Sequence, residues 1–467
     1  MNEILNVKIE KLVFGGKWFA RHSDGRVIFI TGWAIPESIV NLRVLKKKKD
    51  FIEAQITQIV KKSPLETESH PPMPGTPWIN ISYKNQLKIK QDQIIESFFH
   101  IQKYQNEIHF LPIESSPQTL GYRNKIEFSF GKYISLKEWR NEQFNVGFHK
   151  QGEFSRVEDY PNCMLIDENS NKIYKKIREF CKSTGFEAFD QKMVTGFFRH
   201  LVMRMTHHTD EIMIILSVHP KFFPDREWYL EAIKILSAFF QNLAKEHTDI
   251  KSIYISHNEN KSDTSIGELE LIYGKENITE QILGLKFEIS PKSFFQTNTL
   301  GAERLYSIAR DFLDNKEKKR NTILDLYAGT GTLGMIFSPF GKKVYSVELI
   351  KDASEDGKNN AKRNNIDNIE FICAKVEDFL KDFKKNSQKP DLLIIDPPRS
   401  WMHPDALPSI LEFESEEIIY ISCNPATLTR DLEMILKTWK YRIEKVQPVD
   451  MFPHTHHIEV VTSLKRI

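Results

Sequence analysis

The residue best suited to chemistry is Cys423, in the segment Ile418-Ile419-Tyr420-Ile421-Ser422-Cys423-Asn424-Pro425. The four apolar residues predict a buried strand, and a helix pattern opens at Thr427. A thiol between a strand end and a helix start lies on the rim where open α/β sheets hold their ligands. The alternative is a small buried residue that fills a gap, which is the usual role of an isolated cysteine. The rest of the chain must decide between the two.

A glycine-rich turn, Asp325-Leu326-Tyr327-Ala328-Gly329-Thr330-Gly331-Thr332-Leu333-Gly334, follows a predicted strand and opens a helix. Glycines in such a turn let a ligand approach the backbone. No Lys-Ser/Thr pair follows, so the turn is not a Walker-type phosphate cradle. Asp325 would repel pyrophosphate and suits a cation, such as the sulfonium and ammonium groups of S-adenosylmethionine. Glu348 ends the next predicted strand, where an acid binds two ribose hydroxyls. Together these features predict a class I methyltransferase.

Two further segments belong to the same predicted sheet. One strand ends in Asp396-Pro397-Pro398-Arg399, where amino-directed methyltransferases carry an aromatic residue after the two prolines instead of an arginine. The other segment, His454-Thr455-His456-His457-Ile458-Glu459, leads into the last predicted strand. Its histidines are rival bases or a metal cluster. No cysteine or acidic partner stands at ligand spacing, so we predict no metal there.

These motifs resemble those of the RNA uracil-5-methyltransferase family, whose members modify uridines in tRNA or in large-subunit rRNA. The resemblance runs from the N-terminal region to Glu459 and includes residues 289–298, a segment that the family uses at the cofactor site. It implies that Cys423 is the nucleophile and Glu459 the general base. It implies a cofactor site formed by Gln296, Tyr327, Glu348 and Asp396. It also implies uracil contacts from Arg399, Asp396 and Gln296.

The chemistry of this family needs such residues. A thiolate that adds to carbon 6 of uracil makes carbon 5 nucleophilic enough to accept a methyl group, and a base then removes the carbon 5 proton. We therefore expect methylation of carbon 5 of a uridine in RNA, with 23S rRNA favoured and tRNA as the alternative. A non-catalytic RNA-binding or assembly factor is the alternative from another class. Cytosine methylation would require a second cysteine after the Asp-Pro strand.

Two departures from the family pattern stand out. Some relatives hold an iron–sulfur cluster with closely spaced cysteines after the first domain, but residues 72–81 contain none, and only Cys163 could match a downstream ligand. One thiol cannot hold a cluster, so we predict none. The second departure is Lys375, which stands where many relatives place an acid or amide near the adenine.

Composition limits the class of protein. The 467 residues are 40% hydrophobic and 27% charged, as in globular multidomain proteins. No apolar run is long enough to span a membrane, and no secretory signal is expected at the start of the chain. The four cysteines lack paired spacing, which favours a reducing compartment. We therefore predict a cytoplasmic monomer without an obligate protein partner.

The predicted fold is a multidomain α/β chain. Residues 1–62 form five short β-rich runs, typical of a small OB-type barrel, and resemble the RNA-binding TRAM domain. This region carries 12 Lys and Arg against 6 Asp and Glu, and Trp18, Phe19 and Arg21 alternate aromatic and cationic groups. These side chains could meet nucleotides, although some of the aromatic ones must form the core.

Four further segments complete the prediction. Residues 63–77 form a proline-rich linker, because prolines at that density block helix and sheet. Residues 78–112 form a helical segment that packs on the catalytic domain. Residues 113–287 form a central α+β RNA-binding domain, and residues 288–467 form a Rossmann-like methyltransferase sheet.

The central region carries basic residues on predicted strands, namely Arg123, Lys125, Arg199, His200 and Arg204. Two interpretations are open. These side chains could line an open sheet face that binds a phosphate backbone. They could equally be ordinary solvent-side residues of an antiparallel sheet.

Overall fold

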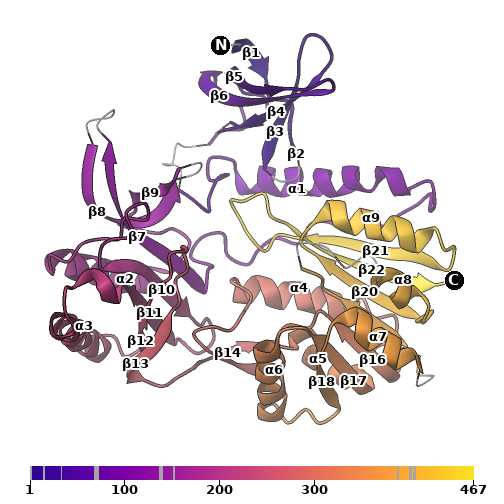
Figure 1. Cartoon of the computed structure of the whole chain (residues 1–467). Coiled ribbons are helices and arrows are strands. Elements are labelled where there is room, and N and C mark those ends of the chain that lie inside the picture. The colour runs from indigo at the N-terminus through magenta and orange to yellow at the C-terminus, as the bar shows by residue number, and fades with distance from the viewer. Residues whose placement is uncertain are drawn as a thin grey trace. The chain divides into compact units, whose positions relative to one another are not determined.

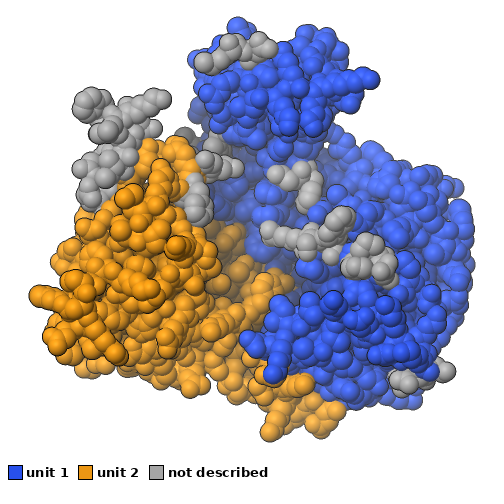
Figure 2. All heavy atoms as spheres, viewed as in Figure 1, with its two compact units in different colours: residues 1–119, 304–354, 368–467 blue, residues 120–303, 355–367 orange. Residues whose placement is uncertain are grey.

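The computed structural model describes residues 3–13, 16–32, 34–67, 73–135, 140–150, 153–385, 389–398, 402 and 406–467. The chain folds into two compact units, shown in different colours in Figure 2. The first unit comprises residues 1–119, 304–354 and 368–467, and the second comprises residues 120–303 and 355–367. Two helices, α4 (Thr299–Asp311) and α6 (Lys351–Arg363), have residues in both units.

Figure 1 labels the elements along the chain. Those of the first unit are β1 (Glu3–Lys8), β2 (Lys11–Val13), β3 (Lys17–Arg21), β4 (Val27–Thr31), β5 (Ile39–Lys47), β6 (Phe51–Lys61), α1 (Tyr83–Ser97), η1 (Phe99–Ile101), β16 (Arg320–Leu326), α5 (Thr332–Phe337), η3 (Ser338–Phe340), β17 (Gly341–Glu348), β18 (Ile369–Cys373), α7 (Val376–Lys385), β19 (Leu392–Ile395), α8 (Ala406–Leu411), β20 (Glu417–Ser422), α9 (Pro425–Leu436), β21 (Tyr441–Val449) and β22 (Glu459–Arg466).

The N-terminal sheet has the strand order β1-β5-β6-β4-β3-β2. Six strands replace the five expected, because the predicted strand 7–12 is divided between β1 and β2. Side chains alternate along β3, so that Trp18 is buried while Lys17 and Arg21 are exposed. The Trp18 indole Nε1 donates to the Gly32 carbonyl at 2.9 Å, which identifies it as a core residue. Phe19 is only half-buried, with the Lys11 Nζ 5.5 Å from its ring centre.

The C-terminal sheet has the strand order β18-β17-β16-β19-β20-β22-β21 (Figure 1). Neighbouring strands from β18 to β20 run parallel, and β22 and β21 join antiparallel. All four residues of β19 are apolar and buried, as expected for a parallel strand covered on both faces. The predicted alternation of strands and helices in this region is confirmed.

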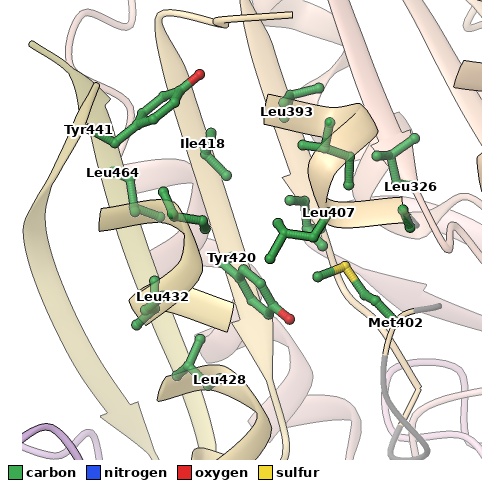
Figure 3. Close-up of a cluster of buried hydrophobic side chains, with 14 of the residues drawn as sticks. Leu326, Leu393, Met402, Leu407, Ile418, Tyr420, Leu428, Leu432, Tyr441 and Leu464 are labelled. Atoms are coloured by element: carbon green, nitrogen blue, oxygen red, sulfur yellow. The ribbon is translucent and has the colours of Figure 1, made fainter. Parts of the chain in front are cut away.

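Helices α1, α7, α8 and α9 contribute to one apolar core with alternate residues of the C-terminal sheet. Figure 3 shows part of this core, where Leu428 and Leu432 of α9 lie against β20. Tyr420 is buried in it, and its hydroxyl donates to the Asp431 carboxylate at 2.8 Å. The strands that carry the predicted site are therefore held from behind by a large core.

The predicted helix at residue 427 begins two residues earlier, at Pro425. Proline suits the first helical position because no partner for its missing N–H is needed there. Asn424 is the N-cap, and its Oδ1 accepts from the Ala426 and Thr427 amides at 3.1 and 3.4 Å. The turn that follows Cys423 is thus defined by side-chain capping.

The elements of the second unit are β7 (Lys125–Ser135), β8 (Arg140–Lys150), β9 (Glu153–Asp159), α2 (Glu168–Ser183), β10 (Phe198–Met205), β11 (Ile212–Val218), η2 (Pro220–Phe222), α3 (Arg226–Glu246), β12 (Ile250–His257), β13 (Glu268–Gly274), β14 (Ile278–Ile282) and β15 (Leu285–Ile289). The central sheet has the order β13-β12-β11-β10-β7-β8-β9, and β14 pairs with β15. The predicted pairing of β7 with β8 is confirmed, with Ser129 opposite Gly147.

The basic residues of β10 correct both sequence interpretations. Every residue of this strand is buried, including Arg199, His200 and Arg204, so they form neither a phosphate-binding face nor a solvent-side row. The Arg199 guanidinium donates to the carbonyls of Asn258, Asn260 and Ser262. Arg204 donates to the carbonyls of Pro291 and Ser293 at 3.2 and 2.7 Å. Through these hydrogen bonds, the two arginines hold the neighbouring loops in place.

Two general features concern the whole described chain. In the part that the structure describes, no helix combines the length and apolarity needed to cross a bilayer. All four cysteines lie in that part, and none forms a disulfide.

Candidate active site

The predicted site residues of the first unit follow one edge of the C-terminal sheet. Leu326 at the end of β16 is paired with Val347 of β17 on one side and with Ile395 of β19 on the other. Tyr327, Glu348 and Asp396 are the next residues on these three strands. Because the strands run parallel, the three residues lie at the same carboxyl edge, where open α/β sheets bind ligands.

The same edge continues to Cys423 and Glu459. In the antiparallel pair of β20 and β22, Ser422 is opposite Val460. Continuing this register by one residue puts Cys423 opposite Glu459, which begins β22. Both residues are partly exposed. The structure therefore brings the predicted nucleophile and the predicted base to adjacent strands.

The turn around Cys423 is held by its neighbours. The Asn424 amide donates to the Ser422 Oγ at 3.1 Å, and the Ser422 hydroxyl donates to the Asn424 carbonyl at 3.2 Å. Cys423 stands just before the N-cap of α9, where the positive end of the helix dipole stabilises a negative charge such as a thiolate.

The glycine turn requires its glycines. Gly331 has a φ of 71°, and a Cβ there would lie 2.2 Å from the Phe371 ring, so any larger residue would displace that ring. Gly329 also has a positive φ of 55°, but a Cβ there would meet no described atom within 4 Å. Tyr327 adopts a left-handed conformation without being glycine, with a φ of 62°. Such strain is typical of functional turns.

Glu348 braces the turn. One carboxylate oxygen accepts from the Gly329 amide at 2.9 Å, and the other accepts from the Ile350 amide at 2.8 Å. Each carboxylate oxygen has a further lone pair. The residue thus orders the loop and keeps acceptor capacity for a ligand hydroxyl.

Two acids give the edge a negative character. Asp325 is buried, and its Oδ2 accepts from the Gly334 amide and the Ser346 hydroxyl, each at 2.9 Å. Burial raises its pKa to about 6. Poor solvation and the nearby Asp325 carboxylate raise the pKa of the partly buried Asp396 to about 7. Two acids that ionise reluctantly next to each other favour a cation beside them.

Two buried polar atoms near this edge have no hydrogen-bond partner among the described residues. They are the Asp325 Oδ1 and the Tyr327 hydroxyl. Buried polar atoms are normally paired, so such atoms indicate a missing ligand or water. Burial raises the pKa of Tyr327, so its hydroxyl stays protonated and can donate.

Gln296 belongs to the second unit, and its segment is tightly held there. Its carbonyl accepts from the Asn124 Nδ2 at 2.7 Å, and the Thr297 carbonyl accepts from the Asn124 amide at 2.9 Å. Arg204 binds the preceding carbonyls of this segment. The other predicted uracil contact, Arg399, lies outside the described residues.

The three histidines before Glu459 differ in environment. His454 is buried, has a φ of 63°, and its Nδ1 lies 2.9 Å from the Gln86 Nε2. His456 and His457 are partly exposed, with ring centres 4.2 Å apart. Among the described residues, no group of three or more His, Cys, Asp or Glu side chains has an arrangement that could hold a metal ion.

The remaining cysteines and Lys375 differ in their exposure to solvent. Cys163 and Cys181 are fully buried, and burial raises the pKa of both thiols. Cys373 is exposed at the end of β18. Lys375 is also exposed, and its carbonyl accepts from the Phe379 amide at the start of α7.

Sequence reasoning missed three buried residues near this edge, namely Gln86, Lys90 and Asp450. The Lys90 Nζ donates to the Asp450 Oδ1 at 2.7 Å, and neither side chain is exposed. The apolar spacing of α1 predicted the helix correctly, yet its buried positions are Gln86, Lys90 and Ile94. The available signal was that Gln86 and Lys90 are spaced four residues apart in line with the apolar Ile94, on one face of the helix.

Comparison with known proteins identifies the chain. The tRNA (uracil-5-)-methyltransferase family model matches residues 82–467. The chain belongs to this family. An uncharacterized RNA methyltransferase of Clostridium tetani is 37% identical over 465 residues, which cover 98% of this chain and 97% of the relative. Another, from Caldanaerobacter subterraneus, is 36% identical and covers 99% of both chains.

A solved member of this kind is the Pyrococcus abyssi tRNA (uracil-54, C5)-methyltransferase in complex with S-adenosyl-L-homocysteine. It is 26% identical with a TM-score of 0.73, covering 99% of this chain and 100% of the other. The family predicted from the motifs is confirmed, and the protein is an RNA methyltransferase.

Proposed function

We propose that the protein methylates carbon 5 of a uridine in RNA with S-adenosylmethionine as the methyl donor. The observation that carries this proposal is the register of β20 and β22, which puts Cys423 opposite Glu459 on the edge that holds the glycine turn. An enzyme that methylates carbon 5 of uracil needs a nucleophile and a base that reach the same ring. The adjacent strands β20 and β22 carry these two side chains.

The residues present fit the methyl donor. Asp325 and Asp396 supply negative charge for its sulfonium and ammonium groups. Glu348 keeps acceptor capacity for ribose hydroxyls, and the Tyr327 hydroxyl is a buried donor without a described partner. Space above Gly329 admits a ligand. We propose that Tyr327, Glu348, Asp396 and Gln296 hold it.

Cys423 acts first in the proposed reaction. Its thiolate adds to carbon 6 of the uracil, and the ring electrons that this releases make carbon 5 nucleophilic. When bound, S-adenosylmethionine supplies an electrophilic methyl group. Capping of α9 by Asn424 holds the thiol at the start of the helix, where its negative charge is stabilised.

Glu459 acts second. After methylation carbon 5 still carries its proton, and the carboxylate removes it. The electron pair of that C–H bond restores the ring double bond, and the Cys423 sulfur leaves carbon 6. The thiolate is thereby regenerated, Glu459 holds the proton, and the product is 5-methyluridine in RNA. Asp396 and Arg399 are proposed to orient the base.

The RNA class has two candidates. The resemblance of the N-terminal region to TRAM-bearing relatives favours 23S rRNA, whereas the Pyrococcus abyssi tRNA enzyme and the family name favour tRNA. We propose that the N-terminal sheet is a TRAM-type barrel that binds this RNA through half-buried Phe19 and exposed Arg21, whose guanidinium carbon lies 5.6 Å from the Phe19 ring centre. The domain boundaries at residues 62, 77, 112 and 287 belong to the same proposal, as do a cytoplasmic location and a monomeric state.

A methyl-transfer assay on total RNA from a deletion strain tests the proposal. With labelled methyl donor, wild-type protein is expected to label one RNA class, and mapping the product distinguishes rRNA from tRNA. Cys423→Ala should abolish transfer, while Cys373→Ala, a cysteine on the exposed end of β18, should retain it.

Glu459→Gln should behave differently from Cys423→Ala. Without the base, the methylated RNA stays attached to Cys423 and migrates as a covalent adduct on a denaturing gel. Full activity of Cys423→Ala would refute the covalent mechanism. Absence of labelling by the wild type on every RNA would favour the non-catalytic factor.

A further inference from the structure

The loop of residues 450–458 connects β21 to β22 and ends at Glu459. The position of Glu459 relative to Cys423 therefore depends on what holds this loop. Five of its backbone or side-chain groups bind residues of α1 or of the segment just before α1, far away in sequence.

Lys90 forms the first tether. Its ammonium donates to the Asp450 carboxylate at 2.7 Å and to the Phe452 carbonyl at 3.2 Å. The same carboxylate oxygen accepts from the Phe452 amide at 3.1 Å. Both side chains are fully buried. One ammonium group thus binds the beginning of the loop at two points.

Gln86, one helical turn earlier, forms the second tether. Its Oε1 accepts from the His454 amide at 2.8 Å, and its Nε2 lies 2.9 Å from the His454 Nδ1. The Trp78 amide donates to the His454 carbonyl at 2.8 Å. His454 is therefore held on both sides in a left-handed conformation with a φ of 63°.

These tethers exceed what anchoring α1 requires. Ile94 already anchors this helix in the apolar core of the C-terminal sheet. Burying an ion pair costs solvation, and apolar residues of similar volume often stabilise a protein as well or better. The specific property of the polar contacts is that they define the path of the loop.

We infer that Gln86 and Lys90 are positioning residues that set the Glu459 carboxylate against carbon 5 of the uracil bound to Cys423. The inference rests on the proposed function. Through these residues, α1 controls the second half of the reaction, the removal of the proton. The first half depends on Cys423, whose turn is held by hydrogen bonds of Ser422 and Asn424.

Two RNA probes separate the two halves. RNA that contains 5-fluorouridine reports attack by Cys423 and methylation, because fluorine cannot leave as a proton would and the adduct accumulates. RNA with tritium on carbon 5 of uridine reports proton removal, because Glu459 releases the tritium into water.

The main variant is Lys90→Met combined with Asp450→Leu, which removes both charges and keeps the core filled. The double variant is expected to form the 5-fluorouridine adduct within about twofold of the wild-type rate. It should release tritium at least roughly tenfold more slowly, because misplacing a catalytic group by about 1 Å costs on the order of 100-fold. Gln86→Met tests the second tether independently. Lys88→Met, an exposed lysine on the same helix, is the matched control.

Equal slowing of adduct formation and tritium release in the variants would overturn the inference, since it indicates a general structural role. Unchanged release in both variants would overturn it as well. If the wild type neither forms the adduct nor releases tritium, the proposed function itself fails. The two failures are therefore distinguishable.

Discussion

In the C-terminal sheet, the polar residues of the proposed site stand where strands end, and the strand interiors that lead to them are apolar, as in β19. The central sheet has the same number of strands, but β10 carries Arg199, His200 and Arg204 within its buried interior. The C-terminal sheet carries its acidic site residues at its edge, where we propose that the ligand binds. In the central sheet, the buried arginines of β10 bind loop carbonyls instead.

This difference distinguishes residues that we propose to bind a ligand from residues that stabilise the fold. Asp325 and Asp396 at the C-terminal sheet have raised pKa values, because burial disfavours their charged forms. Arg204 in the central sheet is compensated by two carbonyls, and burial lowers its pKa to about 10, so it remains charged at neutral pH. We therefore expect edge substitutions to alter ligand binding, and interior substitutions to alter stability.

The largest stability effect is expected for Arg204→Met. It leaves the Pro291 and Ser293 carbonyls without their donor, and an unsatisfied buried group costs about 1–3 kcal/mol. We expect the free energy of unfolding of the second unit, measured with urea, to fall by about 2–4 kcal/mol. Arg226→Met, an exposed arginine in the same unit, is the control. Unchanged stability of Arg204→Met would contradict the expectation that substitutions inside the central sheet alter stability.

The edge of the C-terminal sheet was predictable because its signals are local. Asp325, Glu348, Asp396 and Cys423 each lie at or just beyond the carboxyl end of a strand, and parallel strands bring these ends to one edge of the sheet. The family resemblance added Glu459, which no local pattern distinguishes from a solvent-side residue. The register of β20 and β22 puts Glu459 opposite Cys423, and its role as the base stays a prediction.

The supporting contacts could not be predicted in the same way. Lys90 and Asp450 lie 360 positions apart, and an isolated buried lysine looks like any surface lysine in sequence. Arg204 was misjudged because β10 is covered on both faces, which depends on tertiary packing. The sequence could not show that Trp18 is a core residue and Phe19 only half-buried, because this depends on which face of β3 is buried.

A smaller effect is expected for pH at the edge of the C-terminal sheet. Lowering the pH from about 8 to about 6 protonates Asp396, so affinity for the cationic methyl donor should fall about tenfold. Affinity for S-adenosylhomocysteine, whose sulfur is neutral, should fall less. Calorimetric titration at several pH values measures both.

Asp396→Asn is the control for this titration. The amide cannot ionise, so most of the pH dependence should vanish, and affinity at high pH should match that of the protonated wild type. Because the folded-state pKa of Asp396 is raised, its contribution to stability is present at low pH and is lost as pH rises through about 7. The unliganded variant should therefore be more stable than wild type at about pH 8. A pH dependence that persists in the variant would assign the effect to Asp325 instead.

The smallest effect is expected from removing metal ions. Cys163, the one cysteine that could match a downstream cluster ligand, is fully buried, and its amide donates to the Asn171 Oδ1 at 2.8 Å. Burial raises the pKa of its thiol, which disfavours the thiolate that a cluster requires. Purified protein should contain no iron and show no visible absorption band, and treatment with a chelator should leave methyl transfer unchanged. A brown preparation that loses activity on chelation would contradict this prediction. It would show that activity requires a metal cluster as well as the charged residues at the edge of the sheet.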